Sequence, residues 1–528
     1  MGGPDARRWV TVLVVVGIAL RFWAYAARPS LWLDEILLSR NIIDLPLIDL
    51  LTKPLLLDQV APRGFLLVEK LFVLLLGPNE YALRLFPFLC AVAGMLSFRR
   101  LAERVLSGWA VPFAVALFAL AIPFIKYGAE VKQYGVDSLA AILLVSLALD
   151  LRTREVSTRR RLAAGAAGFV VIWFSQASVL VMAGIGLGLA LEWLAARNPQ
   201  VRRVLFTTVP LWAAASGVAV VAGLRSMTPA TREFMDDFWR SGFLPRPAGP
   251  SSLRWFWDQS LTMFTDPVLL RYRLPEVFLL VALLGLVLLL RRRRDAALLL
   301  LGPLLIGLLA AIAHQYPYRG RLLMYLIPGL LLAIAAGAEG IRRLVSRAHP
   351  ALGGLAMAAL LVLPTAALAT TPPPYDIDHH RELLGYLQQH RQPGDAIWVF
   401  PLTRIGILFY GPRFGLRPGE WKTSVCDRTD TRAYLRDLDQ YRGRPRLWVF
   451  SSTQRAFRSV RSAVRDYLGT IGVKRDSLAL ASLRHGTVYL ELYDLSDTTR
   501  LAAARSEGFP VQPMATDPRP GCRPWTKD

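Results

Sequence analysis

The sequence predicts a polytopic α-helical membrane protein with about 11 transmembrane helices and a C-terminal extracytoplasmic α/β domain. The 528-residue chain is 54% hydrophobic, which is too apolar for a water-soluble protein of ordinary composition. Long runs rich in Leu, Ala and Val recur from Val10 to Ala369. Each run is about long enough to cross ~30 Å of hydrocarbon with ~20 helical residues. After Thr371 mixed charges and Pro/Gly breaks replace these runs, which indicates a soluble domain.

The predicted spans set the domain organisation. They are 9–27, 81–98, 109–125, 134–150, 162–175, 178–195, 204–223, 276–290, 296–313, 322–338 and 351–369. We expect residues 1–370 to form the transmembrane domain, 371–375 a stiff Pro-rich linker and 376–528 the soluble domain. The first span also has the basic start and apolar run of a signal peptide, but Arg21 interrupts that run, so we interpret it as a span.

Arginine clusters predict the orientation of the spans. With eleven spans, six basic clusters fall on one side, at Arg7-Arg8, Arg99 to Arg104, Arg152 to Arg161, Arg197 to Arg203, Arg291 to Arg294 and Arg342 to Arg347. Lys and Arg accumulate in cytoplasmic loops, so this side is cytoplasmic. The N-terminus is then inside and the soluble domain outside. The same loops explain much of the net charge of +23, so we expect no nucleic-acid partner.

The soluble domain shows strand and helix patterns in alternation. Strands are predicted at 396–401, 446–452 and 487–495, and helices at 376–390 and 453–471. Cys426 and Cys522 could pair in an extracytoplasmic domain, whereas Cys90 reads as a small apolar residue of a span. His379-His380 could bind metal, but a solvent-facing helix start is the simpler interpretation. No Cys/His cluster indicates a zinc site, and no phosphate-binding loop is found.

An acidic pair, Asp34-Glu35, follows the first span. Two adjacent carboxylates at the mouth of a membrane helix are unfavourable without a partner. They begin a long outer segment, 28–80, with amphipathic stretches at 36–52 and 61–76, the second of which fits a helix in the membrane interface. The alternative is that the pair caps the helix that follows, because carboxylates favour helix N-termini.

Further charged and aromatic residues fall at the outer ends of distant spans. Lys126, Glu130, Lys132 and Tyr134 lie at the outer ends of the third and fourth spans. His314, Tyr318, Arg319 and Arg321 lie between the ninth and tenth. The topology therefore places three separate parts of the chain at one membrane face. For each basic residue alone, snorkelling of a long side chain to the interface is the alternative.

Together these motifs resemble the GT-C class of polytopic glycosyltransferases, which use polyprenyl-phosphate sugars. The motifs are the acidic pair, the loop QVAPRGFLL at 59–67, Glu130-x-Lys132-x-Tyr134, and YPYRGRLLMYLIPGLLL from Tyr316. The likeness covers residues 9–370 and is nearest to bacterial family-39-type proteins, relatives of protein O-mannosyltransferases and lipid A aminoarabinose transferases. The sequence departs from them at Ala61-Pro62-Arg63, where those relatives often have His-Pro-Pro or Pro-Pro.

The resemblance implies an inverting sugar transfer at the extracytoplasmic face of a bacterial inner membrane. Asp34 would be the general base for an acceptor hydroxyl, and Glu35 would support it or bind the sugar. Lys132, Arg319 and Arg321 would stabilise the departing lipid phosphate. The remaining expected substrate contacts are Arg63, Glu130, Tyr134, His314 and Tyr318. No cofactor is required, and a divalent cation on Asp34 or Glu35 is an alternative.

Three other functions fit parts of the pattern. The sequence also suits a transporter or flippase of lipid-linked or small polar substrates. It suits a non-catalytic envelope assembly protein whose soluble domain binds a partner, and a ligase that moves a whole glycan from a lipid. Against transport, the ionisable residues gather at the ends of spans, and Arg21 is the main exception. The acceptor, a glycan, lipid or protein, is not specified by the sequence.

Overall fold

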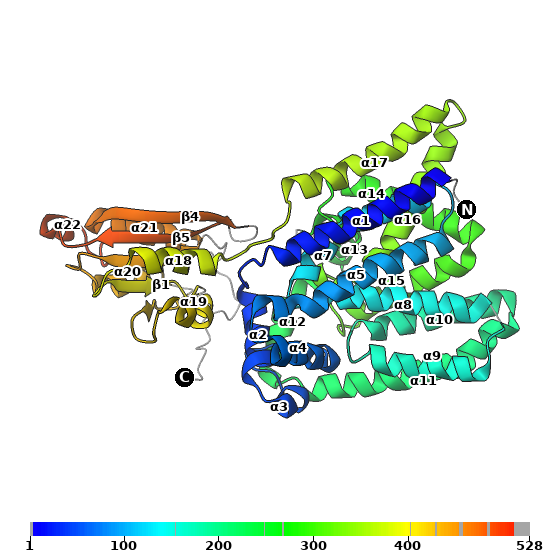
Figure 1. The fold of residues 1–528 in the computed structure, drawn as a ribbon, viewed down its shortest axis with the longest axis horizontal. Coiled ribbons are helices and arrows are strands. Elements are labelled where there is room, and N and C mark those ends of the chain that lie inside the picture. Colours follow the sequence, from blue (N-terminus) through cyan, green and yellow to red (C-terminus); the bar gives the residue numbers. More distant parts are fainter. Residues whose placement is uncertain are drawn as a thin grey trace. The chain divides into compact units, whose positions relative to one another are not determined.

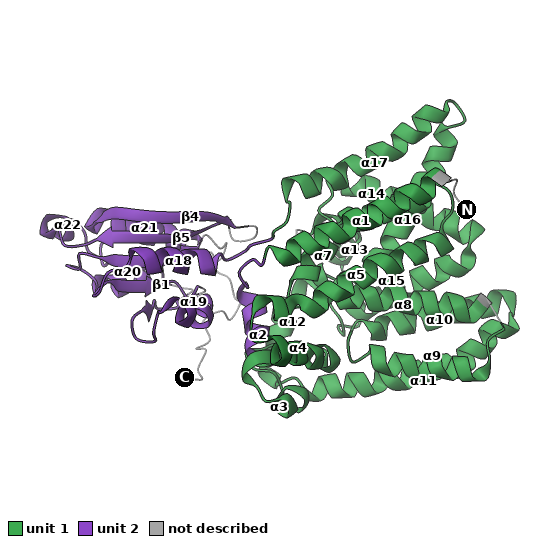
Figure 2. Ribbon diagram, viewed as in Figure 1, with its two compact units in different colours: residues 1–27, 41–374 green, residues 28–40, 375–528 purple. Residues whose placement is uncertain are grey.

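The chain folds into two compact units in the computed structural model (Figure 2). Residues 4–153, 155–247, 249–266, 269–401, 403–427, 430–452, 458–482 and 486–511 are described. Unit 1 comprises residues 1–27 and 41–374, and unit 2 comprises 28–40 and 375–528. This division differs from the expected one, because residues 28–40, which carry the acidic pair, group with the C-terminal domain. The boundary falls inside helix α2 (Leu33–Asp44).

Unit 1 consists of helices throughout its described part (Figure 1). They are α1 (Pro4–Ala26), α3 (Leu47–Thr52), α4 (Arg63–Leu76), α5 (Glu80–Val105), α6 (Ala110–Leu120), α7 (Ile122–Lys126), η1 (Tyr127–Ala129), α8 (Tyr134–Thr153), α9 (Thr158–Val171), α10 (Ser178–Ala196), α11 (Pro199–Arg225), α12 (Pro229–Phe238), η2 (Arg240–Gly242), α13 (Pro250–Thr265), α14 (Pro275–Arg292), α15 (Arg294–Ile312), η3 (Gly320–Leu323), α16 (Ile327–Val345) and α17 (Pro350–Thr370). Nine of the eleven predicted spans fall on one helix each, with shifted ends, whereas 109–125 covers α6 and α7 and 322–338 covers part of η3 and α16.

The polytopic membrane character is clear, but fewer helices qualify as spans than the sequence predicts. In the described residues seven helices are long and apolar enough to cross a membrane, or eight if the bent pair α6–α7 counts as one span. Helix α9 has only 14 residues, and α14 carries Glu276, Arg291 and Arg292 within its 18. Helix α16 begins at Ile327, five residues later than expected, because η3 and its turn precede it.

Arg21 lies at the break between α6 and α7, which are bent by 54°. Its guanidinium donates to the carbonyl of Phe118 at 3.0 Å and to that of Gly17 at 2.8 Å. A broken helix leaves carbonyls without intrahelical donors, and in hydrocarbon such groups need a partner. Arg21 supplies one, so this buried charge has a structural explanation and does not by itself indicate a transport pathway.

Glycines bring the helices of unit 1 into backbone contact. A Cβ on Gly285 of α14 would lie 1.7 Å from the carbonyl oxygen of Ala333 in α16, and one on Gly337 would lie 2.0 Å from that of Val281. Helices α10 and α15 approach equally closely, at Gly184. Small residues allow such close approach between membrane helices, where packing replaces the hydrophobic effect.

The arginine-rich ends of three helices meet in an ion-pair network. Arg152 of α8 binds Glu192 of α10 with two nitrogens, and its third nitrogen donates to Asp295 of α15 at 2.8 Å. Arg293 donates both to Asp295 and, at 2.7 Å, to the carbonyl of Arg104. Four loops that the sequence assigns to one membrane side are therefore joined at one end of unit 1.

Unit 2 contains a five-stranded mixed sheet in the order β2-β1-β3-β5-β4. Its strands are β1 (Ala396–Val399), β2 (Lys422–Thr423), β3 (Leu447–Ser452), β4 (Val473–Ser482) and β5 (Gly486–Asp494). Strand β1 is parallel to β2 and β3, whereas β5 is antiparallel to β3 and β4. Its helices are α18 (His380–His390), α19 (Arg404–Tyr410), η4 (Gly411–Phe414), α20 (Thr431–Asp439), α21 (Arg458–Ile471) and α22 (Thr498–Ala503). Trp398, Tyr434 and Tyr467 are buried in its core.

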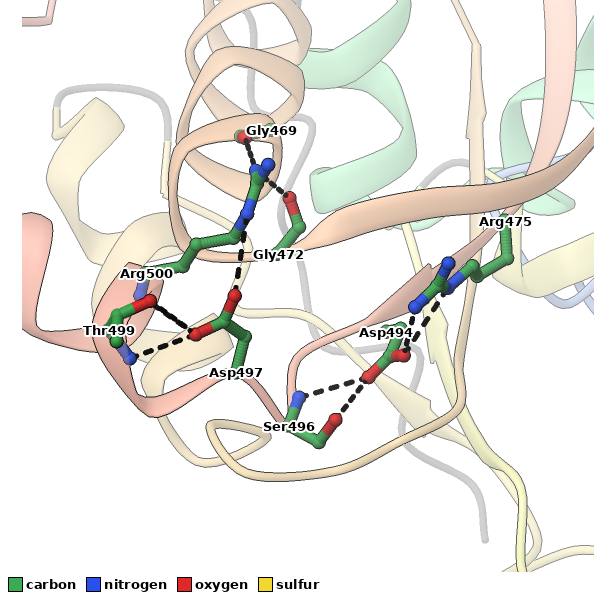
Figure 3. Close-up of polar contacts among 8 residues, drawn as sticks. All are labelled: Gly469, Gly472, Arg475, Asp494, Ser496, Asp497, Thr499 and Arg500. Atoms are coloured by element: carbon green, nitrogen blue, oxygen red, sulfur yellow. Dashed lines mark hydrogen bonds and ion pairs between the residues drawn. The ribbon is translucent and has the colours of Figure 1, made fainter.

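The turn after β5 is closed by two aspartates (Figure 3). Asp494 accepts from the amide and hydroxyl of Ser496 and from Arg475, and these bonds lower the pKa of its carboxyl to about 2. Asp497 caps α22 by accepting from the amide of Thr499 at 2.9 Å. Arg500 then donates to the carbonyl of Gly472 at 2.9 Å, which fastens α22 to the chain before β4.

The predicted strands at 396–401, 446–452 and 487–495 correspond to β1, β3 and β5. The helix expected over 376–390 begins only at His380, because His379 has a left-handed conformation with φ 47°. Of the helix expected over 453–471, the first five residues lie outside the described part of the chain. Cys426 is disulfide-bonded and Cys90 is free and buried, while Cys522 lies outside the described residues.

Candidate active site

The acidic pair forms the first turn of α2 in unit 2. Asp34 is half-buried, whereas Glu35 is 1% exposed. Helix α2 starts at Leu33, so Trp32 is its N-cap residue and Glu35 its third helical residue. Glu35 Oε2 accepts from the amide of Trp32 at 3.4 Å. This is the backward half of a capping box, so the geometry gives Glu35 the helix-capping role that the sequence left as the alternative.

In unit 1, the segment between α7 and α8 carries a buried charged group. Lys126 Nζ lies 3.5 Å from Glu130 Oε1, and both side chains are almost wholly buried. Lys132 is 4% exposed, and its Nζ donates to Gln59 Oε1 at 3.0 Å. Gln59 comes from the outer segment before α4. Glu130 and Lys132 therefore lie where two of the predicted outer segments meet, with Lys132 bonded to a neutral amide and Glu130 to a cation.

Arg321 joins the same region from the segment between α15 and α16. Its guanidinium carbon lies 5.2 Å from the ring centre of Tyr134 and 6.0 Å from that of Trp239. The Tyr134 ring also packs edge-on against Tyr127 at 5.1 Å. Stacking on aromatic faces holds a guanidinium in place while its edge nitrogens remain able to bind oxygen atoms. Thus Tyr134 and Arg321, predicted from separate motifs, are brought into contact.

The other residues of the late loop are fastened to the segment around η2. Arg319 is exposed and donates to the hydroxyl of Ser241. The amide of Tyr318 donates to the carbonyl of Gly242 at 2.8 Å, and His314 Nε2 donates to the carbonyl of Leu244 at 2.9 Å. Burial raises the pKa of the Tyr318 phenol, so it stays protonated at neutral pH. These bonds fix the conformation of the loop. Arg319 is exposed whereas Arg321 is half-buried, so Arg321 is the better candidate for binding an anion.

Arg63 has a structural position in the described contacts. Its guanidinium donates to the carbonyls of Leu50 at 2.6 Å and Lys53 at 2.7 Å, at the end of α3. Unpaired carbonyls at a helix C-terminus attract such cations. Arg63 therefore closes the turn between α3 and α4, which is the loop where the sequence departs from the GT-C pattern.

Sequence reasoning missed three residues of this region, namely Gln59, Trp239 and Ser241. Gln59 lies in the quoted loop motif but carries no charge to draw attention. Trp239 and Ser241 lie between the seventh and eighth predicted spans, in a segment for which the sequence predicts no substrate contacts. Only the tertiary structure shows that this segment contacts Arg319 and Arg321.

One group of side chains in the described residues has the arrangement of a cation site. Ligand atoms of Asp376, His379 and Glu382 lie within 4.8 Å of one another in unit 2. This group contains one of the two histidines that the sequence singled out and neither member of the acidic pair. Two of its carboxylates already accept hydrogen bonds from Ser30, from its amide at 3.1 Å and from its hydroxyl at 3.1 Å.

No protein-family model and no curated protein matches this sequence. Among solved structures, the chain is similar to ArnT from Cupriavidus metallidurans in the apo state, with 14% identity and a TM-score of 0.49 over 92% of this chain and 98% of that one. The same protein bound to undecaprenyl phosphate gives 14% identity and a TM-score of 0.46 over 91% and 98%. The oligosaccharyltransferase of Archaeoglobus fulgidus in the apo form gives 11% identity and a TM-score of 0.48 over 87% and 70%. These are proteins of the class that the sequence motifs resemble.

Proposed function

We propose that this protein is an integral-membrane glycosyltransferase that moves a sugar from a polyprenyl-phosphate carrier to an acceptor hydroxyl, with inversion, at the extracytoplasmic face. The observation that carries the proposal is the cluster of unit 1 formed by Lys132, Tyr134 and Arg321. Arg321, from a distant outer segment, lies on the ring of Tyr134, two residues after the buried Lys132. The same segment carries the buried ion pair of Lys126 and Glu130. A lipid phosphate needs such positive charge, and sugar rings favour aromatic surfaces.

In the proposed reaction the acceptor oxygen attacks the anomeric carbon while the bond from that carbon to the phosphate oxygen breaks. Asp34 takes the acceptor's proton, and the lipid phosphate leaves with the bonding electrons. Lys132 and Arg321 stabilise the charge that develops on the leaving phosphate. Glu35 holds the start of α2, so its contribution is to position Asp34.

The reaction is tested with the purified protein and a panel of radiolabelled polyprenyl-phosphate sugars. Asp34→Asn is expected to lower turnover by about 10²- to 10⁴-fold, because general-base catalysis contributes that much. The matched control is Asp49→Asn, since Asp49 lies on α3 and its ion pair in the described part of the chain is with Lys53, four residues on, at 2.9 Å. Equal turnover by wild type and Asp34→Asn would show that Asp34 is not the base. Failure of the wild type to consume any donor of the panel would refute the transferase proposal.

We further propose that the N-terminus is cytoplasmic and unit 2 extracytoplasmic, in a bacterial inner membrane. The joined arginine-rich loops support a common side for these loops. The disulfide at Cys426 supports an oxidising compartment for unit 2. A reporter fused to the C-terminus tests this orientation, since an enzyme that is active only outside the cytoplasm should be active there. A cytoplasmic readout would reverse the topology and separate Asp34 from the proposed reaction.

A further inference from the structure

The segment before the acidic pair, residues 28–33, is held by side chains of the C-terminal domain. Both parts belong to unit 2. The amide of Ser30 donates to Asp376 at 3.1 Å, the amide of Leu31 to the Tyr410 hydroxyl at 2.8 Å, and the amide of Leu33 to Asp378 at 3.0 Å. These partners lie 345 to 379 residues further along the chain.

Three more hydrogen bonds hold the same segment. The Ser30 hydroxyl donates to Glu382 at 3.1 Å and accepts from the amide of Arg381 at 3.2 Å. The Arg381 guanidinium donates to the carbonyl of Arg28 at 3.1 Å. Ser30 and Leu31 are buried, and Leu33 is half-buried. A buried backbone amide without an acceptor would be unfavourable, so the three acceptors on the C-terminal domain are required by this path of the chain.

Asp378 accepts from the amide of Leu33, which is the first residue of α2. The first amides of a helix have no intrahelical acceptor, and they are normally satisfied by a side chain close in sequence. Here the amide of Leu33 is satisfied by a carboxylate of another part of the chain, and Glu35 satisfies that of Trp32. A carboxylate at this point also interacts favourably with the helix dipole.

The C-terminal domain builds these acceptors on a fixed framework. His380 Nε2 lies 3.5 Å from Asp378 Oδ2, and the His380 side chain is 4% exposed. The ring packs against α19 where Gly406 has no side chain, because a Cβ there would lie 2.1 Å from the ring. Helix α19 also carries Tyr410, which is fully buried. Tyr410 is thus part of α19, and Asp378 is connected to the same helix through the His380 ring.

We infer that the C-terminal α/β domain positions the candidate base Asp34 by capping the start of α2, with Asp378 and Tyr410 as the positioning residues. The inference rests on the proposed function of Asp34. Asp34 directly follows the amide that Asp378 holds, so a shift of the helix start moves the carboxylate with it. A misplacement of about 1 Å at a reacting group can lower a rate about 100-fold. The C-terminal domain thereby acts on catalysis without contacting the substrate.

The hydrogen bonds to residues 28–33 are tested by amide hydrogen exchange of the full-length protein in detergent, read by mass spectrometry on peptides covering 28–36. The wild type is expected to protect the amides of Leu31 and Leu33. Tyr410→Phe removes the acceptor for Leu31, and Asp378→Ala removes that for Leu33, so each should raise the exchange rate of this peptide by about tenfold or more. Asp378→Asn keeps an acceptor oxygen and should retain most of the protection. Asp476→Ala is the matched control, because Asp476 bonds Tyr386 in the same domain and does not contact the segment.

Positioning is tested by steady-state kinetics of the same variants with the donor that the wild type uses. We expect Asp378→Ala to lower kcat by about 10- to 100-fold with little change in KM for the lipid donor, and Asp378→Asn to recover most of it. If Asp378→Ala raised the amide exchange rate of peptide 28–36 but left kcat unchanged, the inference would be overturned. A wild-type protein whose 28–36 peptide is unprotected would overturn it as well. If no donor is turned over at all, the proposed function fails, and the exchange experiment still decides whether the domain holds this segment.

Discussion

Replacing Lys132 by Met tests the assignment of the phosphate-binding cation. Lys132 is 4% exposed, and its ammonium donates to the neutral Gln59 amide at 3.0 Å. Methionine keeps the length and apolar character of the stem while it removes the charge. In folding, two effects oppose each other. The lost hydrogen bond leaves Gln59 without this donor, at about 1–3 kcal/mol, but burying an ammonium is itself unfavourable by several kcal/mol. The free energy of unfolding should therefore change by no more than about 2 kcal/mol.

Catalysis has no such compensation, because the charge on the leaving phosphate develops only during the reaction. Removing one preorganised stabiliser typically raises the barrier by about 2.7–4 kcal/mol, or ~10²–10³ in kcat. We expect Lys132→Met to lose that much activity on a polyprenyl-phosphate sugar while its thermal midpoint moves by only a few degrees. Lys132→Arg should keep part of the activity, since it keeps the charge.

The control is Lys53→Met, because the side chain of Lys53 is 65% exposed and pairs with Asp49 at a surface position. It should leave both turnover and stability unchanged. If Lys132→Met retained wild-type kcat/KM within about threefold, a factor too small for a lost transition-state cation, the assignment of Lys132 would be refuted. A fall in activity that followed a matching loss of folded protein would show that Lys132 has a structural role instead.

Three other predictions concern stability. Gly285→Ala should abolish or strongly weaken folding, because its Cβ would overlap the backbone of α16, whereas Gly354→Ala meets nothing within 4 Å and should be neutral or slightly stabilising in thermal unfolding. The folded-state pKa of Asp494, about 2, lies below the ordinary value, so its stabilising effect is present above pH ~4 and lost as the pH falls towards 2. The difference in thermal midpoint between wild type and Asp494→Asn should accordingly shrink over this range, and a constant difference would contradict it. Cys426→Ser, or reduction, should lower the midpoint, since losing a disulfide typically removes about 2–5 kcal/mol; an unchanged midpoint would show that the disulfide does not stabilise the fold.

The sequence predicts helices well where one hydrophobic periodicity runs through the whole segment. It predicts helix ends less well where a single turn residue divides the segment. The amphipathic stretch over 36–52 is divided at Pro46 into α2 and α3, because proline begins a helix more easily than it continues one. Strand β4 was not predicted because it is largely exposed, with polar residues such as Lys474 and Asp476 at its start. An exposed edge strand lacks the apolar alternation from which strands are recognised.

The candidate site shows the same contrast between local and long-range information. Charge and motif spacing identified Tyr134 and Arg321 separately, and the fold brings them to 5.2 Å. Gln59 could not be assigned to Lys132, because a neutral side chain in a loop has no signature of its own. The role of Asp378 could not be predicted either, because it accepts from the amide of Leu33, which lies 345 residues away in sequence. Such pairings follow from the tertiary path of the chain and not from any local pattern.

Helix geometry separates the two carboxylates that the sequence presents as a pair. Successive residues of an α-helix point about 100° apart, so Asp34 and Glu35 cannot face the same environment once α2 has formed. Glu35 turns inward, is 1% exposed and bonds the N-cap amide, whereas Asp34 stays half-buried. A carboxylate that accepts from the N-cap amide of its own helix holds the helix start in place, which suits a supporting role better than proton exchange with a substrate. The helix start thus explains why one member of the acidic pair is the better candidate for the base.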